Sequence, residues 1–251
     1  MSTLGVFYTC YKEGIAVEKS IATHYKYHPD CKVYLVSEGD DFSHLEMKFP
    51  NLKANLVEDI STWPVKCVNA SNFRNVDIQD RIKTYFHAIL GRIEDATNFC
   101  NTTHILHSQP DVILRGRLTI PDDAKLLQPF VNVYDERRGG LKELLRQTPG
   151  AVDFNYWGFP QIHSSNVFNE MLKLIRGNPE VLNSIITADC AIHHSDMFMP
   201  FLFALTGYTS THNPEVVECL REPNWRSTNH PLVHQCRELY PKIDYDGFHA
   251  T

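Results

Sequence analysis

Short apolar runs alternate with helical patterns through the first half of this 251-residue chain. The clearest helical pattern covers residues 78–93, where apolar side chains recur at i, i+4, i+7 and i+8. Strands alternating with helices indicate an α/β fold, whose mostly parallel central sheet has helices on both faces. The expected strands are residues 4–9, 32–37, 54–59, 103–108 and 130–135.

The first predicted helix follows the first strand, and Ile15, Ile21, Ala22 and Tyr25 lie close to one face of it. In the less regular second half, the pattern predicts a strand followed by a loop over residues 151–165. A helix over 166–180 is expected to stop at Gly-Asn-Pro. Residues 196–208 are apolar on most sides, which predicts a buried helix, and 209–251 are expected to wrap the core.

Composition narrows the function classes. The formal net charge of −6 argues against nucleic-acid binding, and it requires local cations wherever an anionic nucleotide is to bind. The seven cysteines are scattered without a C-x-x-C pair, which favours a reducing compartment such as the cytoplasm. No apolar run approaches the ~20 residues of a transmembrane helix, and the first residues lack a signal-peptide pattern.

Polar residues follow three of the predicted strands. The first strand leads into YTCYKEG, the second into VSEGDD, and the strand at 103–108 into QPD. Ligands of open parallel sheets bind beyond the carboxyl ends of the strands, so these segments predict the site. The sequence contains neither a Walker A motif nor G-x-G-x-x-G, which argues against P-loop and dinucleotide chemistry.

The succession of these segments resembles the nucleotide-sugar-dependent glycosyltransferases of the GT-A fold. The resemblance rests on VFYTCYKEGIAVEKSI, YLVSEGDDFSHLE, THILHSQPDV and TADCAIHHSDMFMPFLFALTGY, and it covers roughly residues 1–208. It implies a Rossmann-like GT-A fold in a single domain, 1–251, and suggests the compact type encoded by large algal DNA viruses. Residues 1–135 would bind the nucleotide sugar, and 136–251 would form the acceptor side and the C-terminal wrap.

The resemblance also implies a cation, Mn²⁺ or Mg²⁺, at the segment corresponding to the family's D-x-D. A divalent cation held by oxygen ligands neutralises the departing diphosphate. Here Gln109 replaces the first aspartate and Asp111 remains as the metal ligand, while a late histidine, His249, would complete the metal shell. The alternatives are that Asp111 only closes a turn after Pro110 and that His249 lies in a tail turn.

The donor would be a UDP- or TDP-sugar, contacted by residues at the strand ends and on the long helix. For Glu38, Gly39 and Asp40 the alternative interpretation is an acidic surface turn, and for Lys12 it is a solvated lysine at a helix start. Arg81 borders the apolar stripe of the long helix and would reach the diphosphate, whereas Arg92 is expected to be an ordinary exposed arginine. The remaining donor-binding candidates are Thr9, Tyr11, Lys12, Glu38, Gly39, Asp40 and Gln109.

Transfer of a hexosyl or deoxyhexosyl group to a glycan or glycoprotein hydroxyl requires a base near the acceptor. An inverting mechanism is favoured, in which one carboxylate takes the hydroxyl proton. Asp189 is the first candidate for this base and Asp196 the second, because Asp196 also suits the N-terminus of the following helix. Two rival functions remain open: a non-catalytic sugar- or nucleotide-binding module, and a sugar nucleotidyltransferase.

Overall fold

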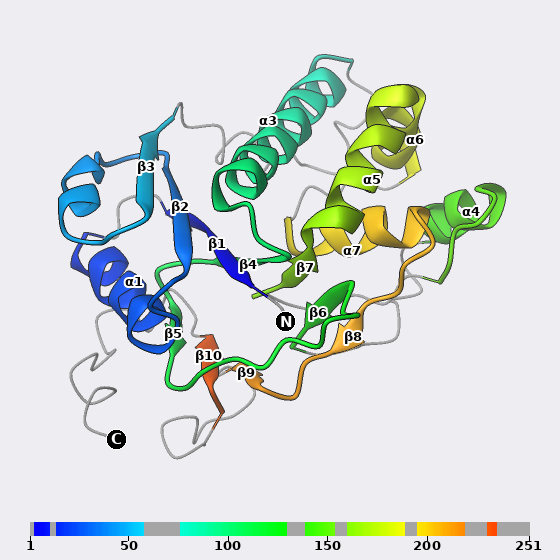
Figure 1. Ribbon diagram of the computed structural model, residues 1–251. Coiled ribbons are helices and arrows are strands. Elements are labelled where there is room, and N and C mark those ends of the chain that lie inside the picture. The colour runs from blue at the N-terminus through cyan, green and yellow to red at the C-terminus, as the bar shows by residue number, and fades with distance from the viewer. Residues whose placement is uncertain are drawn as a thin grey trace.

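The computed structural model describes residues 3–10, 14–57, 76–129, 139–153, 160–188, 195–218 and 230–234, and within these ranges a seven-stranded sheet forms the centre (Figure 1). The strand order is β3–β2–β1–β4–β7–β6–β8. The strands are β1 (Leu4–Cys10), β2 (Lys32–Ser37), β3 (Leu52–Leu56), β4 (His104–Ser108), β6 (Leu126–Gln128), β7 (Ile162–Ser164) and β8 (Thr211–His212).

The first half of the sheet is parallel, as the alternating pattern predicts. β1 pairs in parallel with β2 and β4, and β2 pairs in parallel with β3, whereas β7 is antiparallel to β4 and β6. The strand expected at 32–37 has those bounds, while the one expected at 130–135 begins where the described residues stop. In 151–165 the part predicted as a loop contains β7, while 154–159, within the part predicted as a strand, lie outside the described residues.

Helices cover both faces of the sheet, so successive residues of β1 enter different apolar clusters (Figure 1). Val6 and Tyr8 pack with α1 (Ile15–Tyr27) and the short 3-10 helix η1 (Ser43–Met47). Phe7 belongs to the larger cluster on the other face. That cluster is built by α3 (Val76–Cys100), α4 (Gly139–Gln147), α5 (Ser165–Gly177), α6 (Glu180–Ala188) and α7 (Ser195–Leu205).

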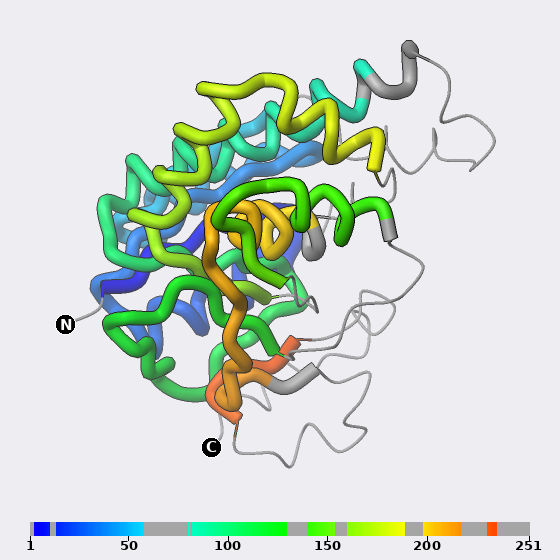
Figure 2. Tube along the Cα trace, turned by 90° about the vertical axis from the view of Figure 1, so that its right-hand side faces the viewer, coloured from blue at the N-terminus to red at the C-terminus, as the bar shows by residue number. Residues whose placement is uncertain are grey.

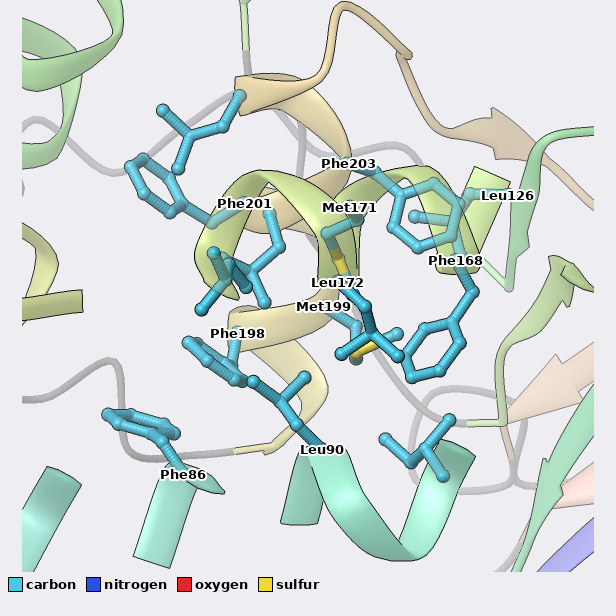
Figure 3. Close-up of a cluster of buried hydrophobic side chains, with 14 of the residues drawn as sticks. Phe86, Leu90, Leu126, Phe168, Met171, Leu172, Phe198, Met199, Phe201 and Phe203 are labelled. Atoms are coloured by element: carbon cyan, nitrogen blue, oxygen red, sulfur yellow. The ribbon is translucent and has the colours of Figure 1, made fainter. Parts of the chain in front are cut away.

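Aromatic side chains fill the larger cluster (Figure 3). The rings of Phe86 on α3 and Phe198 on α7 stack with centroids 3.9 Å apart, and Phe168, Phe201 and Phe203 are fully buried beside them. The predicted buried helix is therefore confirmed as α7. Among the described residues, no helix is both long enough and apolar enough to cross a lipid bilayer.

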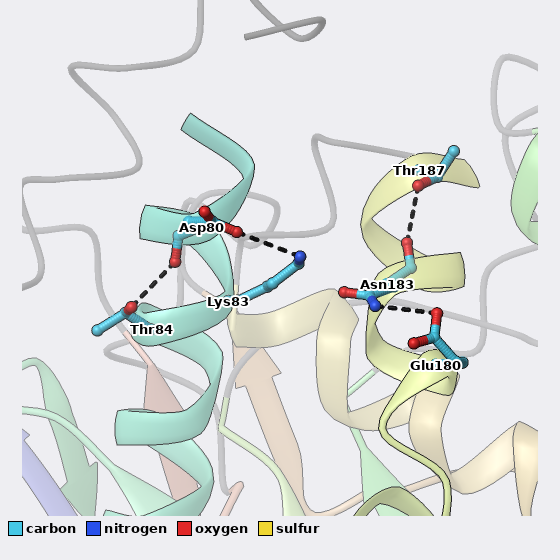
Figure 4. A network of polar contacts seen from close by, with 6 residues as sticks. All are labelled: Asp80, Lys83, Thr84, Glu180, Asn183 and Thr187. Atoms are coloured by element: carbon cyan, nitrogen blue, oxygen red, sulfur yellow. Dashed lines mark hydrogen bonds and ion pairs between the residues drawn. The ribbon is translucent and has the colours of Figure 1, made fainter. Parts of the chain in front are cut away.

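The polar contacts that Figure 4 draws on α3 and α6 stay within each helix. Thr84 donates to the carbonyl of Asp80, and Lys83 pairs with the Asp80 carboxylate at 3.3 Å. On α6, Asn183 donates to Glu180 at 3.0 Å. The packing of these helices against each other is instead apolar, since their buried side chains share one cluster.

The buried face of α1 differs from the expected one. Ile15 is 73 % exposed, so its predicted place on the apolar face is wrong. The buried face includes Ile21 but also the polar side chains of Ser20, Thr23 and His24, each at most 1 % exposed. Hydrophobic spacing alone misses such a face because its polar groups are satisfied by hydrogen bonds that only the folded chain provides.

A second, smaller sheet joins distant parts of the chain. Its order is β5–β10–β9, formed by β5 (Val112–Leu114), β9 (Val216–Glu218) and β10 (Leu232–His234). β5 follows β4 directly, and β10 pairs with it in antiparallel register, His234 opposite Val112. In Figure 2 the red segment of β10 accordingly lies beside the orange β9.

Three buried histidines should make folding sensitive to pH. Burial lowers the pKa of His24 to about 4, that of His107 to about 3, and that of His163 well below its ordinary value. The rings of His107 and His163 meet edge-on, with centroids 4.8 Å apart. Within the described chain, neither ring nitrogen of His163 has a hydrogen-bond partner.

We expect the free energy of unfolding to fall as the pH drops below about 6.5, the ordinary pKa of histidine. Below that pH the unfolded chain binds protons that the folded chain excludes, so stability is fully present above it and declines on acidification. At pH 5 His24 and His107 each contribute a loss of ~2 kcal/mol, and His163 acts in the same direction. Urea denaturation between pH 5 and 8 measures this slope.

His163→Leu is the matched variant, because it removes two unsatisfied buried nitrogens and one proton-binding site of the unfolded chain. Its stability at pH 7 should equal or exceed that of the wild type, and its pH slope should be shallower. An unchanged slope would contradict the assignment of the pH dependence to buried histidines.

Candidate functional site

The carboxyl ends of β2, β1 and β4 lie side by side at one edge of the sheet. Cys10 is level with Ser37, Tyr8 is level with Ser108, and the backbone N–H of Glu38 donates to the Cys10 carbonyl at 3.2 Å. The chain runs outward from β1 to β3 and then returns to form β4 on the other side of β1. This reversal is the place where open α/β sheets bind their ligands.

Asp111 lies in a tight turn at this edge. The Val112 N–H donates to the Gln109 carbonyl at 2.9 Å, which closes the turn with Pro110 and Asp111 at its centre. Proline suits the first central position because its φ is already fixed. Asp111 is nevertheless only 2 % exposed, although most aspartates in surface turns are solvated. It is therefore both a turn residue and a buried carboxylate.

His234 at the end of β10 faces this carboxylate. Its Nε2 lies 3.7 Å from Oδ2 of Asp111, and both side chains are largely buried. Burial lowers the pKa of His234 to about 4, so the imidazole is neutral at pH 7 and the contact is not an ion pair there. The sequence analysis did not identify His234 as a site residue. The short apolar pair Leu232-Val233 before it indicates at most a strand, not a functional histidine.

An ion pair joins the end of β2 to the long helix. Arg92 of α3 binds the Glu38 carboxylate, and the two side chains are only 12 % and 9 % exposed. The expectation that Arg92 is an ordinary exposed arginine is therefore wrong. Arg92 precedes the buried Ile93, and the helix turns it toward the carboxyl edge of the sheet, where Glu38 supplies a counter-charge.

The segment after β2 is shaped by Ser37. Its buried hydroxyl accepts hydrogen bonds from the N–H groups of Gly39 and Asp40, at 3.3 and 3.2 Å. Asp40 is exposed and Gly39 half-buried. Thr9, on β1, is level with Val36 and half-buried. The structure thus brings Thr9, Glu38 and Asp40 to the same edge as the Asp111 turn.

Several predicted site residues lie beyond what the structure describes. Arg81 belongs to α3 and Asp196 to the first turn of α7, as expected of a helix start, but their side chains are outside the described set. Their predicted roles remain predictions, as do those of the residues outside the described ranges: Tyr11, Lys12, Asp189 and His249. Gln109 is half-buried beside Asp111.

Among the described residues, no group of three or more histidine, cysteine, aspartate or glutamate side chains has the geometry of a metal site. His104 and His107, three apart on β4, are separated as the strand period predicts: His104 Nε2 lies 3.0 Å from the Ala124 carbonyl, and His107 packs on Phe7. In the described part of the chain, Asp111 and His234 form a contact between a carboxylate and an imidazole at the carboxyl edge of the sheet.

We expect Arg92→Met to lower the free energy of unfolding by ~3 kcal/mol, because it leaves the largely buried Glu38 carboxylate without its counter-charge. Replacing both partners, Glu38→Met with Arg92→Met, should recover most of that loss. The control is Arg176→Met, which breaks an ion pair with Glu94 whose arginine is 62 % exposed and should cost under ~1 kcal/mol. Equal losses for the two arginines in urea denaturation would contradict the buried pair.

Comparison with known proteins shows similarity in fold but not in sequence. By sequence, the chain matches no protein-family model and no curated protein. By structure it is similar to the galactosyltransferase LgtC in complex with donor and acceptor sugar analogs. That match has a TM-score of 0.53 and 13 % identity, over 98 % of this chain and 94 % of the other.

An active-site mutant of LgtC also matches, with a TM-score of 0.48 and 14 % identity, over 92 % of this chain and 87 % of the other. Neither structure supports the viral origin that the resemblance suggested. The predicted fold class is confirmed: the chain has the α/β architecture of the GT-A glycosyltransferases, with a mostly parallel central sheet.

Proposed function

We propose that this protein is a metal-assisted glycosyltransferase that moves a sugar from a UDP- or TDP-sugar to an acceptor hydroxyl of a glycan or glycoprotein. The observation that carries the proposal is the buried Asp111 carboxylate, which faces His234 at the topological switch between β1 and β4. The fold supports the same activity, because the similar LgtC structure was solved with donor and acceptor sugar analogs.

Asp111 and His234 are the residues that would hold a divalent cation in this proposal. Two ligand atoms that are each about 2.1 Å from one cation lie roughly 3.0–3.7 Å apart. The Asp111 Oδ2 and His234 Nε2 atoms are 3.7 Å apart, too far for a hydrogen bond, and the histidine is neutral, as a ligand must be. Gln109 would add an uncharged oxygen from the start of the same turn.

When bound, such a cation supplies a positive charge against the negative charge that grows on the departing diphosphate. This acidic chain needs that charge locally, since its own formal net charge is −6. Arg81 would bind the diphosphate oxygens, and Thr9, Glu38 and Asp40 would hydrogen-bond the nucleoside. The ion pair with Arg92 would hold the Glu38 carboxylate in one orientation, which suits recognition of a ribose or base.

Asp189 would take the proton from the acceptor hydroxyl, with Asp196 as the second candidate, in a transfer that inverts the anomeric centre. A hydroxyl attacks poorly while it keeps its proton, so this base belongs within hydrogen-bond reach of the acceptor. The competing function is a binding module without turnover, because Gln109 stands where a second metal-binding carboxylate is expected. Hydrolysis of a nucleotide sugar without acceptor would favour the enzyme.

We expect UDP- or TDP-sugars to raise the melting temperature of the protein further when Mn²⁺ is present, and Asp111→Asn to abolish that Mn²⁺-dependent increment. A ligand at 100 times its Kd adds ~2.7 kcal/mol to the free energy of unfolding, which a thermal-shift assay resolves. The asparagine keeps the shape of the side chain but removes the charge that would hold the cation.

The control variant is Asp30→Asn, which removes an exposed carboxylate at the opposite edge of the sheet and should leave the increment intact. An increment that survives in Asp111→Asn would reject Asp111 as a metal ligand. Saturable binding of the nucleotide sugar with neither hydrolysis nor transfer would favour the binding module over the enzyme.

A further inference from the structure

The buried polar face of α1 lies against the turn that carries Asp111. Ser20, Thr23 and His24 occupy positions i, i+3 and i+4, so they share one side of the helix, and each is at most 1 % exposed. A buried helix face normally presents apolar side chains, since an unsatisfied polar group there destabilises the fold. Three adjacent polar side chains therefore indicate specific hydrogen-bond partners.

The two hydroxyls of this face bind the backbone after Asp111. Ser20 Oγ donates to the Val112 carbonyl at 2.5 Å and lies 3.4 Å from the Gln109 carbonyl. Thr23 Oγ1 accepts a hydrogen bond from the Leu114 N–H at 3.0 Å and donates to the Ser20 carbonyl at 2.7 Å. β5 is an edge strand whose sheet neighbour is β10, and these hydroxyls occupy its other edge.

His24 binds the residue at the end of β4. Its Nδ1 lies 2.9 Å from the Ser20 carbonyl, which can only accept, so Nδ1 carries the proton. Burial keeps the imidazole neutral at pH 7, and its Nε2 therefore accepts the hydrogen bond of the Ser108 hydroxyl at 3.0 Å. The helix thus holds the chain immediately before the turn as well as after it.

We propose that Ser20, Thr23 and His24 are positioning residues that fix the Asp111 carboxylate opposite His234, and so set the cation affinity of the site. The inference rests on the proposed function for the role of the cation. The helix holds the turn at Ser108, Gln109, Val112 and Leu114, on both sides of Asp111, whereas β10 holds β5 on its other edge and carries His234. Displacement of the turn from α1 changes the distance between the two ligands.

Thr23→Val and Thr97→Val form a matched pair that isolates this effect. Both threonines are buried in helices, and each hydroxyl donates to a carbonyl of its own helix at 2.7 Å. Of these two threonines, Thr23 also accepts a hydrogen bond from the backbone N–H of Leu114. Valine keeps the shape of threonine, so both variants should fold, and any difference between them reports the contact with the turn.

We expect Thr23→Val to weaken Mn²⁺ binding by about tenfold, as loss of an outer hydrogen bond to a ligand-bearing group does, and Thr97→Val to leave it unchanged. Titration calorimetry with Mn²⁺ alone measures the affinity. Ser20→Ala, which loses the bond to Val112, should act in the same direction as Thr23→Val. A purely structural role would lower the melting temperature of both threonine variants and leave the Mn²⁺ affinity of both unchanged.

NMR chemical shifts of the Asp111 carboxyl carbon and the His234 ring nitrogens, recorded without metal, test the positioning independently of the cation. They should move in Thr23→Val and not in Thr97→Val. Equal shifts and equal affinities in the two variants would overturn the inference. A wild-type protein that binds no Mn²⁺ would reject the proposed cation, while the chemical shifts would still decide whether α1 positions Asp111.

Discussion

β1 lies between β2 and β4 and pairs in parallel with both, so the carboxyl ends of three strands are aligned to within a residue or two. Because backbone hydrogen bonds fix this register, the segments after the three strands must emerge at one edge. The sheet is covered on both faces, where it packs against apolar clusters. The position of the candidate site therefore follows from the pairing of β1.

Several buried polar contacts lie close to that edge. The α1 face, the Glu38–Arg92 pair and the Asp111–His234 contact all lie around the ends of β2 and β4, whereas the cluster under α3, α5 and α7 is built of aliphatic and aromatic side chains. Burying charges and hydroxyls is unfavourable unless their partners are in place. Buried polar groups from separate elements therefore meet at this edge, as expected of a ligand site.

Asp111 depends on two separate parts of the chain. α1 lies immediately after β1, and β10 lies among the last described residues, yet both contact the short segment that follows β4. One holds the backbone of the turn, and the other presents an imidazole to its carboxylate. The candidate cation site thus needs distant parts of the fold, although its central carboxylate comes from the short segment QPD.

The sequence by itself determined the alternation of strands and helices, the buried α7 and the acidic and amide groups after the strands, because local periodicity and turn chemistry encode these features. It also located Asp111 at the end of the central strand. It did not determine the polar face of α1, the burial of Arg92 or the place of His234. Only the tertiary structure decided these, because each depends on a contact or strand pairing between residues far apart in sequence, which no local pattern records.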